Sequence, residues 1–255
     1  MSTVLATRGV SKYFSGIMAL DRVTLEVNAG ERVGLIGPNG AGKTTLFNCI
    51  LGVLPVEVGE VELNGEDITS LPVHHRARKG IGRTFQQIEL FADSTVRDHL
   101  VIAYRANRPR WAVVHDLLTL GRPRPEEMEA SDDVLELLGL QGLADEPVER
   151  LSLGQGRLLE VARTLMTNPD VVLLDEPSSG LDRRETAALA ETLVEIQAER
   201  GFAVLLVEHD IELVSSFTTR SYLLDFGHLL TSGPTEEVMA SPEMRAAYLG
   251  TAVVA

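Results

Sequence analysis

The stretch GLIGPNGAGKTTL, residues 34–46, constrains the fold of this chain more than any other feature. Its spacing matches G-x-x-x-x-G-K-[ST] at Gly37, Gly42, Lys43 and Thr44. The apolar run ERVGLIG before it is typical of a buried strand, and KTTLFNCILGVL after it is typical of a helix. A phosphate-binding P-loop requires this strand–loop–helix context. We therefore predict an α/β fold built on a P-loop nucleotide-binding core.

Each part of this loop has a physical role at a phosphate. Glycines let backbone N–H groups curve around phosphate oxygens, and the start of the following helix adds partial positive charge. Lys43 is expected to pair with the terminal phosphates, and the Thr44 hydroxyl is expected to bind Mg²⁺. The alternative is a glycine-rich turn with a chance lysine, which average composition makes a rare match in 255 residues. The loop predicts binding of a nucleoside triphosphate.

Charge and hydropathy exclude several classes of protein. The net charge of −14, from 23 basic and 37 acidic residues, argues against a nucleic-acid partner. The single cysteine, Cys49, allows no intrachain disulfide and is expected to be a small buried residue. We expect no signal peptide, because MSTVLATRGVSKYF lacks an apolar core, and no run approaches the 18 apolar residues that a membrane span needs.

Hydrophobic patterning divides the expected single domain, residues 1–255, into three parts. VLATRGV, LDRVTLEV and VGEVELNG alternate as strands, which predicts an N-terminal antiparallel β subdomain with a turn at Asn64–Gly65. Helical spacing around Trp111, Val114 and Leu118 belongs to a predicted helical subdomain over residues 88–151. Residues 1–87 and 152–255 are expected to form the core, with VVLLDEP and FAVLLVEHD as buried parallel strands. A hairpin is predicted around Gly227.

Two further segments point to phosphate chemistry. VVLLDEP places Asp175 at the end of a buried strand, where it can hold Mg²⁺, and Glu176 next to it suits a general base for the attacking water. LSLGQGRLLEVAR supplies Ser152 as a helix N-cap and Gly154 for close backbone approach, so a second helix start can contact phosphate. Alone, each segment could be a plain strand end or a plain helix cap.

With these segments in order, the chain resembles the ATP-binding cassette (ABC) ATPase family over nearly its whole length. GPNGAGKTT is similar to the Walker A motif, VVLLDE to Walker B, and LSLGQ to the signature motif, with Leu153 at the usual third glycine. RTFQ resembles the Q-loop and supplies Gln86. SSGLD resembles the D-loop and supplies Asp182, and VEHD resembles the switch segment and supplies His209.

The resemblance implies a role for each matched residue. The expected catalytic residues are Glu176, His209 and Gln86, and the expected Mg²⁺ ligands are Thr44, Gln86 and Asp175. The expected ATP-binding residues are Phe14, Gly37, Pro38, Asn39, Gly40, Ala41, Gly42, Lys43, Thr44, Thr45, Ser152, Gly154, Gln155 and Asp182. Phe14 is placed against adenine, with Tyr13 as the alternative. Singly, the small motifs also fit a strand-end histidine, a loop amide, a helix cap at Asp182 and a core phenylalanine.

RTFQ, the long insert, LLVEHDIELV and the ending AAYLG further resemble the ATPase subunits of branched-chain amino acid importers, and urea-type importers share most of these features. The resemblance implies an ATP hydrolase paired head to tail with a second ABC ATPase subunit, identical or paralogous. It also implies integral membrane permease subunits, an indirect partner in a periplasmic or lipoprotein substrate-binding protein, and a peripheral location at the cytoplasmic face of the membrane. The alternatives are a urea or amide importer, an exporter, a soluble ABC ATPase and a small-molecule P-loop kinase, which would need no LSLGQ.

Force is expected to reach the membrane subunits where the core meets the helical subdomain. QQIELFADS, residues 86–94, would expose Ile88, Leu90 and Phe91 in a loop able to receive a short helix. The alternative, held open here, is that these side chains fill the core of the helical subdomain.

Overall fold

The computed structural model describes residues 2–84, 93–106 and 123–249, and its first strands form an antiparallel sheet of order β2-β1-β4-β5. The strands are β1 (Thr3–Phe14), β2 (Ile17–Asn28), β4 (Val58–Leu63) and β5 (Glu66–Asp67). Asn64 and Gly65 join β4 to β5 with φ of 52° and 77°, the left-handed pair that a two-residue hairpin needs. The predicted antiparallel β subdomain and its turn are confirmed.

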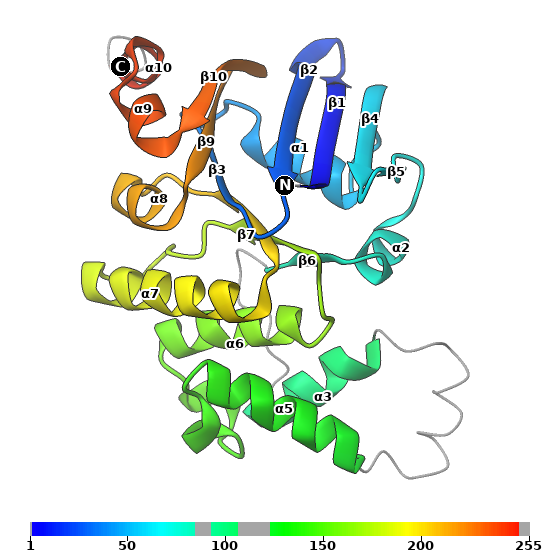
Figure 1. Cartoon of the computed structure of the whole chain (residues 1–255), viewed down its shortest axis with the longest axis vertical. Coiled ribbons are helices and arrows are strands. Elements are labelled where there is room, and N and C mark those ends of the chain that lie inside the picture. Colours follow the sequence, from blue (N-terminus) through cyan, green and yellow to red (C-terminus); the bar gives the residue numbers. More distant parts are fainter. Residues whose placement is uncertain (1, 85–92, 107–122, 250–255) are drawn as a thin grey trace.

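A second sheet of order β10-β9-β3-β8-β7-β6 crosses the centre of the molecule (Figure 1). Its strands are β3 (Arg32–Ile36), β6 (Ile81–Arg83), β7 (Val171–Asp175), β8 (Ala203–Val207), β9 (Arg220–Asp225) and β10 (His228–Pro234). All neighbours pair in parallel except β9 and β10, which form the predicted hairpin through Phe226 and Gly227. The sheet is therefore mainly parallel, as the apolar runs predict.

Alternate residues of the central strands enter two different cores. On β7, Val171 and Leu173 pack with the antiparallel sheet and α1 (Lys43–Leu51), whereas Val172 and Leu174 pack with the helices on the other face. Every residue of β7 and β8 is buried. This is why both segments read as continuous apolar runs: each side of the sheet is covered.

Helices cover the second face and extend below it. The longer helices are α3 (Val96–Ala106), α5 (Pro125–Leu137), α6 (Leu153–Leu165) and α7 (Arg183–Arg200). The shorter elements are η1 (Gln141–Leu143), η2 (Val148–Arg150), α8 (Ile211–Phe217), α9 (Thr235–Ala240) and α10 (Pro242–Leu249). In Figure 1, α6 contacts α3, α5 and α7 and so joins the lower helices to the core.

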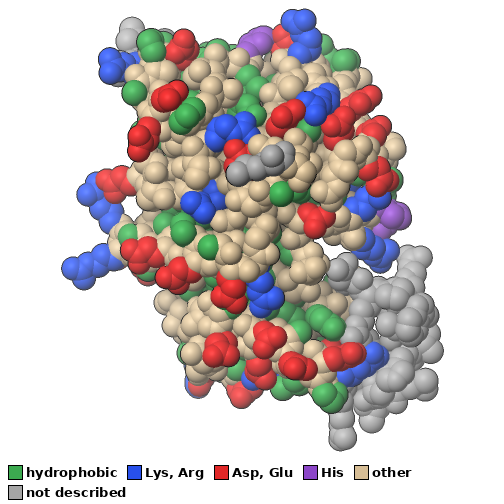
Figure 2. Space-filling view, viewed as in Figure 1, with side chains coloured by type: hydrophobic (Ala, Val, Ile, Leu, Met, Phe, Trp, Pro, Cys, Tyr) green, Lys and Arg blue, Asp and Glu red, His purple; other side chains and the backbone are tan. Residues whose placement is uncertain are grey.

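Four of these elements, α3, α5, η1 and η2, fall within residues 88–151, the range predicted for a helical subdomain. The boundaries at residues 88 and 151 remain a prediction. Trp111, Val114 and Leu118 lie outside the described residues, as does the Gly250 that ends AAYLG. Within the described ranges, no helix is both long and apolar enough to cross a membrane. Figure 2 shows acidic side chains gathered over the lower part of the visible face, where α5 and α7 lie.

One arginine fixes the far end of α1. Arg76, on α2 (Val73–Arg78), is 2% exposed, and its guanidinium donates to four carbonyls. Two belong to the end of α1, Cys49 at 2.8 Å and Ile50 at 2.6 Å, and two belong to the loop before α2. Cationic donors satisfy the carbonyls that a helix end leaves open, so Arg76 anchors the helix that begins at the P-loop.

Candidate functional site

The sheet order brings the predicted site segments together at one edge. β8 lies between β3 and β7, and all three run in parallel, so their carboxyl ends meet. The P-loop follows β3, Glu176 follows the last residue of β7, and His209 lies two residues after β8. Loops at this edge of an open parallel sheet form its usual ligand-binding site.

The P-loop backbone takes conformations that exclude side chains. Gly37, Gly40 and Gly42 have φ of 152°, 82° and 105°. A Cβ on Gly37 would lie 2.0 Å from the carbonyl oxygen of Leu224, so only glycine fits there. The tight curve leaves backbone N–H groups and the start of α1 facing the same space, and the first turn of α1 carries no acidic residue. An anion is the ligand that this arrangement suits.

Lys43 is folded onto this loop. Its side chain is 7% exposed, and Nζ donates to the carbonyl oxygens of Gly37 at 2.6 Å and Pro38 at 3.0 Å. Burial lowers the pKa of Lys43, and the nearby carboxylate of Glu176 partly opposes this effect. The ammonium therefore lies inside the curve, close to the acidic edge of β7. Next to it, Thr44 is exposed and Thr45 is half-buried.

The end of β7 presents two carboxylates in different settings. Asp175 is 4% exposed and accepts a hydrogen bond from Arg83 at 3.2 Å. Burial raises the pKa of Asp175, against the opposing effect of the Arg83 cation. Glu176 is half-buried with a left-handed φ of 47°, and its N–H donates to the carbonyl of Val207 at 2.9 Å. The turn aims the two side chains differently and ties Glu176 to β8.

His209 lies beside Glu176. Its imidazole Nδ1 is 4.0 Å from Glu176 Oε1 and 3.6 Å from Glu208 Oε2, and its side chain is 58% exposed. Glu208, which the motif analysis passed over, is fully buried behind it. The sequence signal for Glu208 was its place directly after the apolar run FAVLLV. A carboxylate buried at the end of such a strand needs several hydrogen-bond donors around it.

The signature segment forms a capped helix start. Ser152 Oγ accepts from the N–H of Gln155 at 3.2 Å, and Gln155 Oε1 accepts from the N–H of Ser152 at 2.9 Å. Ser152 is exposed, and Gly154 and Gln155 are half-buried. Leu153 lies against Gly180, where a built Cβ would come within 3.0 Å of Leu153 Cδ2. The segment therefore packs beside the D-loop and exposes the capped end of α6.

The structure bears on two of the alternatives for single residues, and four predicted residues are not described. Asp182 does cap α7, because its carboxylate accepts from the N–H groups of Arg184 at 2.7 Å and Glu185 at 2.9 Å. Phe14 is not a core residue: it is 43% exposed, as is Tyr13, at the β1–β2 turn. Lys12 Nζ lies 5.3 Å from the centre of the Phe14 ring. Gln86 lies outside the described residues, as do Ile88, Leu90 and Phe91.

The donor set fits a nucleotide-bound Mg²⁺ rather than an all-protein metal cage. Among the described residues, no group of three or more His, Cys, Asp or Glu could hold a metal ion. One buried carboxylate, Asp175, ends β7, and one exposed hydroxyl, Thr44, lies in the first turn of α1 after the P-loop, both at the same edge of the sheet. Mg²⁺ commonly takes one or two protein oxygens, substrate phosphates and waters.

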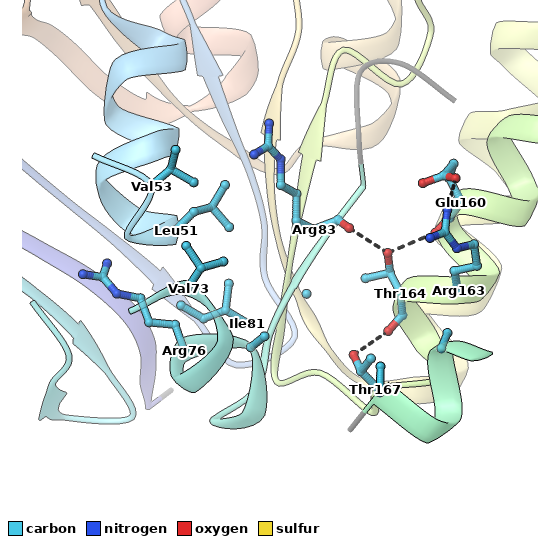
Figure 3. Close-up of a pocket in the computed structure, with 14 residues that line it drawn as sticks. Leu51, Val53, Val73, Arg76, Ile81, Arg83, Glu160, Arg163, Thr164 and Thr167 are labelled. Atoms are coloured by element: carbon cyan, nitrogen blue, oxygen red, sulfur yellow. Dashed lines mark hydrogen bonds and ion pairs between the residues drawn. The ribbon is translucent and has the colours of Figure 1, made fainter. Parts of the chain in front are cut away.

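A hollow of about 340 Å³ lies away from the P-loop, between the core and the lower helices (Figure 3). Leu51, Val53 and Val73 form an apolar wall, of which Val53 and Val73 are about half exposed at 51% and 44%. On the opposite wall, Thr164 Oγ1 donates to the carbonyl of Arg83 at 3.0 Å, and Thr167 donates to Thr164. The hollow thus has one apolar wall and one polar wall, and a hydrogen bond connects the polar wall to the end of β6.

Comparison with known proteins finds similarity along the whole chain. A family model described as ABC transporter matches residues 20–179. The chain is 38% identical over 251 residues to the high-affinity branched-chain amino acid transport ATP-binding protein BraF of Pseudomonas aeruginosa, covering 98% of both proteins. It is 37% identical to LivG of Salmonella typhimurium and 36% identical to LivG of Escherichia coli K12, each a high-affinity branched-chain amino acid transport ATP-binding protein, over 252 residues and 98% of both chains.

Solved structures agree with the fold. The ADP conformation of an ATP-binding cassette of an ABC transporter superposes with a TM-score of 0.88 at 30% identity, covering 98% of this chain and 100% of that one. A nucleotide-free ATP-binding cassette from an ABC transporter gives a TM-score of 0.85 at 30% identity, covering 96% and 98%.

Proposed function

Because the chain belongs to the ABC transporter family and is an ATP hydrolase of that family, we propose that it drives import of branched-chain or other hydrophobic amino acids. The observation that carries the choice of substrate is the full-length similarity to BraF and LivG. Urea or amide import and export are the competing assignments.

Uptake assays separate these assignments. Cells that lack the chain should lose uptake of labelled leucine, isoleucine and valine, and the wild-type gene should restore it. Lys43→Ala should fail to restore it, because the P-loop loses the cation that lies within its curve. Unchanged amino-acid uptake with loss of urea uptake would reassign the substrate, and normal uptake of both with impaired efflux would identify an exporter.

In the proposed reaction, the P-loop holds ATP before hydrolysis. Backbone N–H groups of residues 40–45 and the start of α1 bind the phosphates, and the Lys43 ammonium exchanges its two carbonyl partners for phosphate oxygens. The remaining Walker A residues, Gly37, Pro38 and Asn39, shape the loop. Phe14 stacks on adenine from the β1–β2 turn, with Tyr13, equally exposed, as the alternative.

The strand-end residues then act on the terminal phosphate. Thr44, Asp175 and Gln86 are the residues that would hold Mg²⁺, which supplies charge neutralisation on the phosphates when bound. Glu176 accepts the proton of the attacking water, and His209, 4.0 Å from Glu176, donates to the γ-phosphate. Asp175 is buried and Glu176 is half-buried, so the two adjacent carboxylates lie in different surroundings and take different tasks.

We further propose that each ATP site is split between two ABC ATPase subunits placed head to tail. Ser152, Gly154 and Gln155 present an exposed helix start that bonds within itself and not to the P-loop of its own chain. Asp182 lies at the start of α7, two residues after Gly180, against which Leu153 of this segment packs. A second subunit, identical or paralogous, would bring its own ATP against these residues.

A bulky substitution at the signature segment tests the split site. Ser152→Arg should leave ATP binding by the single chain intact and abolish hydrolysis, because the blocked helix start belongs to the opposite site. Ser152→Ala is the matched control, since it loses the same cap, worth about 1 kcal/mol, without adding bulk. Loss of ATP affinity in the arginine variant would contradict the split site. Normal hydrolysis would show that LSLGQ only caps α6 and takes no part in an ATP site.

The proposed partners at the membrane are integral permease subunits, with a periplasmic or lipoprotein substrate-binding protein acting through them. The chain would then sit peripherally on the cytoplasmic face of the membrane. The hollow between Val53, Val73 and α6 supports this, because its apolar wall suits a short permease helix and its polar wall joins β6, the strand before Gln86. Val73→Asp should weaken co-purification of permease subunits without changing ATP binding. The acidic net charge supports the absence of a nucleic-acid partner.

A further inference from the structure

A buried carboxylate with no task in the mechanism above lies between two loops at the sheet edge. Glu208 follows β8 directly, and its side chain is 0% exposed. Its Oε1 accepts from the N–H of Ser178 at 3.0 Å and from the Ser178 hydroxyl. Its Oε2 accepts from the N–H of His209 at 2.8 Å and from the N–H of Asp210 at 3.2 Å. Each oxygen therefore serves a different loop.

The two loops carry the residues proposed to act on the γ-phosphate. Ser178 lies in the turn that starts at Glu176, where the N–H of Ser179 donates to the Glu176 carbonyl at 3.1 Å. His209 and Asp210 begin the switch segment. The Glu208 carboxylate therefore connects the turn after Glu176, the proposed base, to the backbone of His209, the proposed γ-phosphate ligand.

The same turn is held from its other side by α6. Arg157 is 7% exposed, and its Nη2 donates to the carbonyl of Ser179 at 3.0 Å. Burial lowers the pKa of Arg157, while the carboxylates of Glu160 and Glu208 oppose the effect. α6 starts at the signature segment, which places the turn between that helix and the switch.

Only a carboxylate can make this connection. Four donors converge on two oxygens, and each oxygen of an ionised glutamate accepts. A glutamine in the same place presents an oxygen to one pair of donors and an NH₂ group to the other. One pair of bonds would be replaced by donors facing donors, a costly arrangement at a fully buried position.

We propose that Glu208 is a positioning residue for ATP hydrolysis, which keeps Glu176 and His209 in register by fastening the turn at Ser178 to the switch segment. Arg157 extends the fastening to α6. A movement of the signature helix would then reach the base and the switch of the same chain through Ser179. The residue acts through its neighbours and does not contact ATP.

The decisive variant is Glu208→Gln in the full chain, compared with Glu236→Gln at an exposed position on α9. Glu208→Gln should lower kcat for ATP by about tenfold or more, while KM for ATP and the affinity for a non-hydrolysable ATP analogue stay within about twofold. Amide hydrogen exchange should become faster at residues 178–180 or at residues 209–210. The affected segment is the one whose donors then face the glutamine NH₂ group instead of an oxygen. Glu236→Gln should change none of these. A wild-type kcat, or unchanged exchange in both segments, would overturn the proposal.

A combination with His209→Ala separates positioning from a general loss of stability. If Glu208 keeps Glu176 and His209 in register, the two variants should not be independent, and the double variant should lose less activation free energy than the sum of the two single losses. Additive losses would show a separate structural effect and overturn the proposal. Ser178→Ala keeps the backbone donor and removes only one of the four bonds, so it should fold normally, lower kcat about threefold and quicken exchange at 178–180, the segment that this bond helps to hold. Wild-type behaviour of this milder variant would also count against the proposal.

Discussion

Replacement of Glu176 by glutamine tests the proposed base with the least disturbance to the fold. Glutamine is nearly isosteric, and two backbone hydrogen bonds that hold this position do not depend on the side chain. The N–H donates to Val207 at 2.9 Å and the carbonyl accepts from Ser179 at 3.1 Å. Glutamate and glutamine have the same conformational free-energy cost at the left-handed φ of 47°. Folding stability should therefore change little.

The rate should change much more than the stability. Glutamine cannot accept the proton of the attacking water, and loss of general-base help alone costs about 10²–10⁴ in rate. At about 1.4 kcal/mol per factor of ten, this corresponds to about 3–6 kcal/mol of transition-state stabilisation. ATP affinity should hold or rise, because the variant removes a negative charge that lies near Lys43 and the terminal phosphates.

The assay is size-exclusion chromatography of Glu176→Gln with Mg-ATP, with turnover measured in parallel and the partner subunit supplied if it is a paralogue. We expect a long-lived dimer that does not turn over. Glu195→Gln, at an exposed position on α7, is the matched control and should behave as wild type. Full turnover in Glu176→Gln would refute Glu176 as the base. A dead variant that stays monomeric with its partner present would refute the head-to-tail ATP site.

Three further predictions concern stability. Gly37→Ala should cost about 3 kcal/mol or more in urea unfolding, because the new Cβ meets Leu224 O at 2.0 Å, whereas Gly40→Ala, with no atom within 4 Å of its Cβ, should cost only about 1 kcal/mol for its left-handed φ. Arg76→Met should cost about 3 kcal/mol, because four carbonyls lose a buried cationic donor, and an unchanged urea midpoint would contradict the cap. Burial of Glu31 raises its pKa, but its hydrogen bonds to Arg220 and Asn28 outweigh burial and leave the pKa below the ordinary 4.5, so this stabilisation is present above pH 4.5 and is lost as pH falls further. Glu31→Gln should lose less stability than wild type on acidification below about pH 4.5, and parallel curves would contradict the assignment.

Features set by a few adjacent residues could be predicted from the sequence. The spacing from Gly37 to Thr44 requires a P-loop, because only glycine accepts the φ values of that curve. Asn64–Gly65 predicts a tight hairpin, and Ser152 predicts a helix cap, since the side chain bonds three residues ahead. The runs of β7 and β8 predict strands covered on both faces. In each case the cause and the structure lie within one turn of chain.

Other features depend on partners far apart in the sequence, and only the tertiary structure decides them. No residue of VVLLDEP or VEHD says that β8 lies between β3 and β7, and this order brings Glu176 within 4.0 Å of His209. Arg76 caps a helix that ends some 25 residues earlier, with a separation of 26 to Ile50. In the sequence, Glu208 is an acidic residue at a strand end, and only the structure shows that Ser178, 30 residues away, donates to it. Strand order and buried polar bonds follow from the summed burial of the whole core, which no local pattern contains.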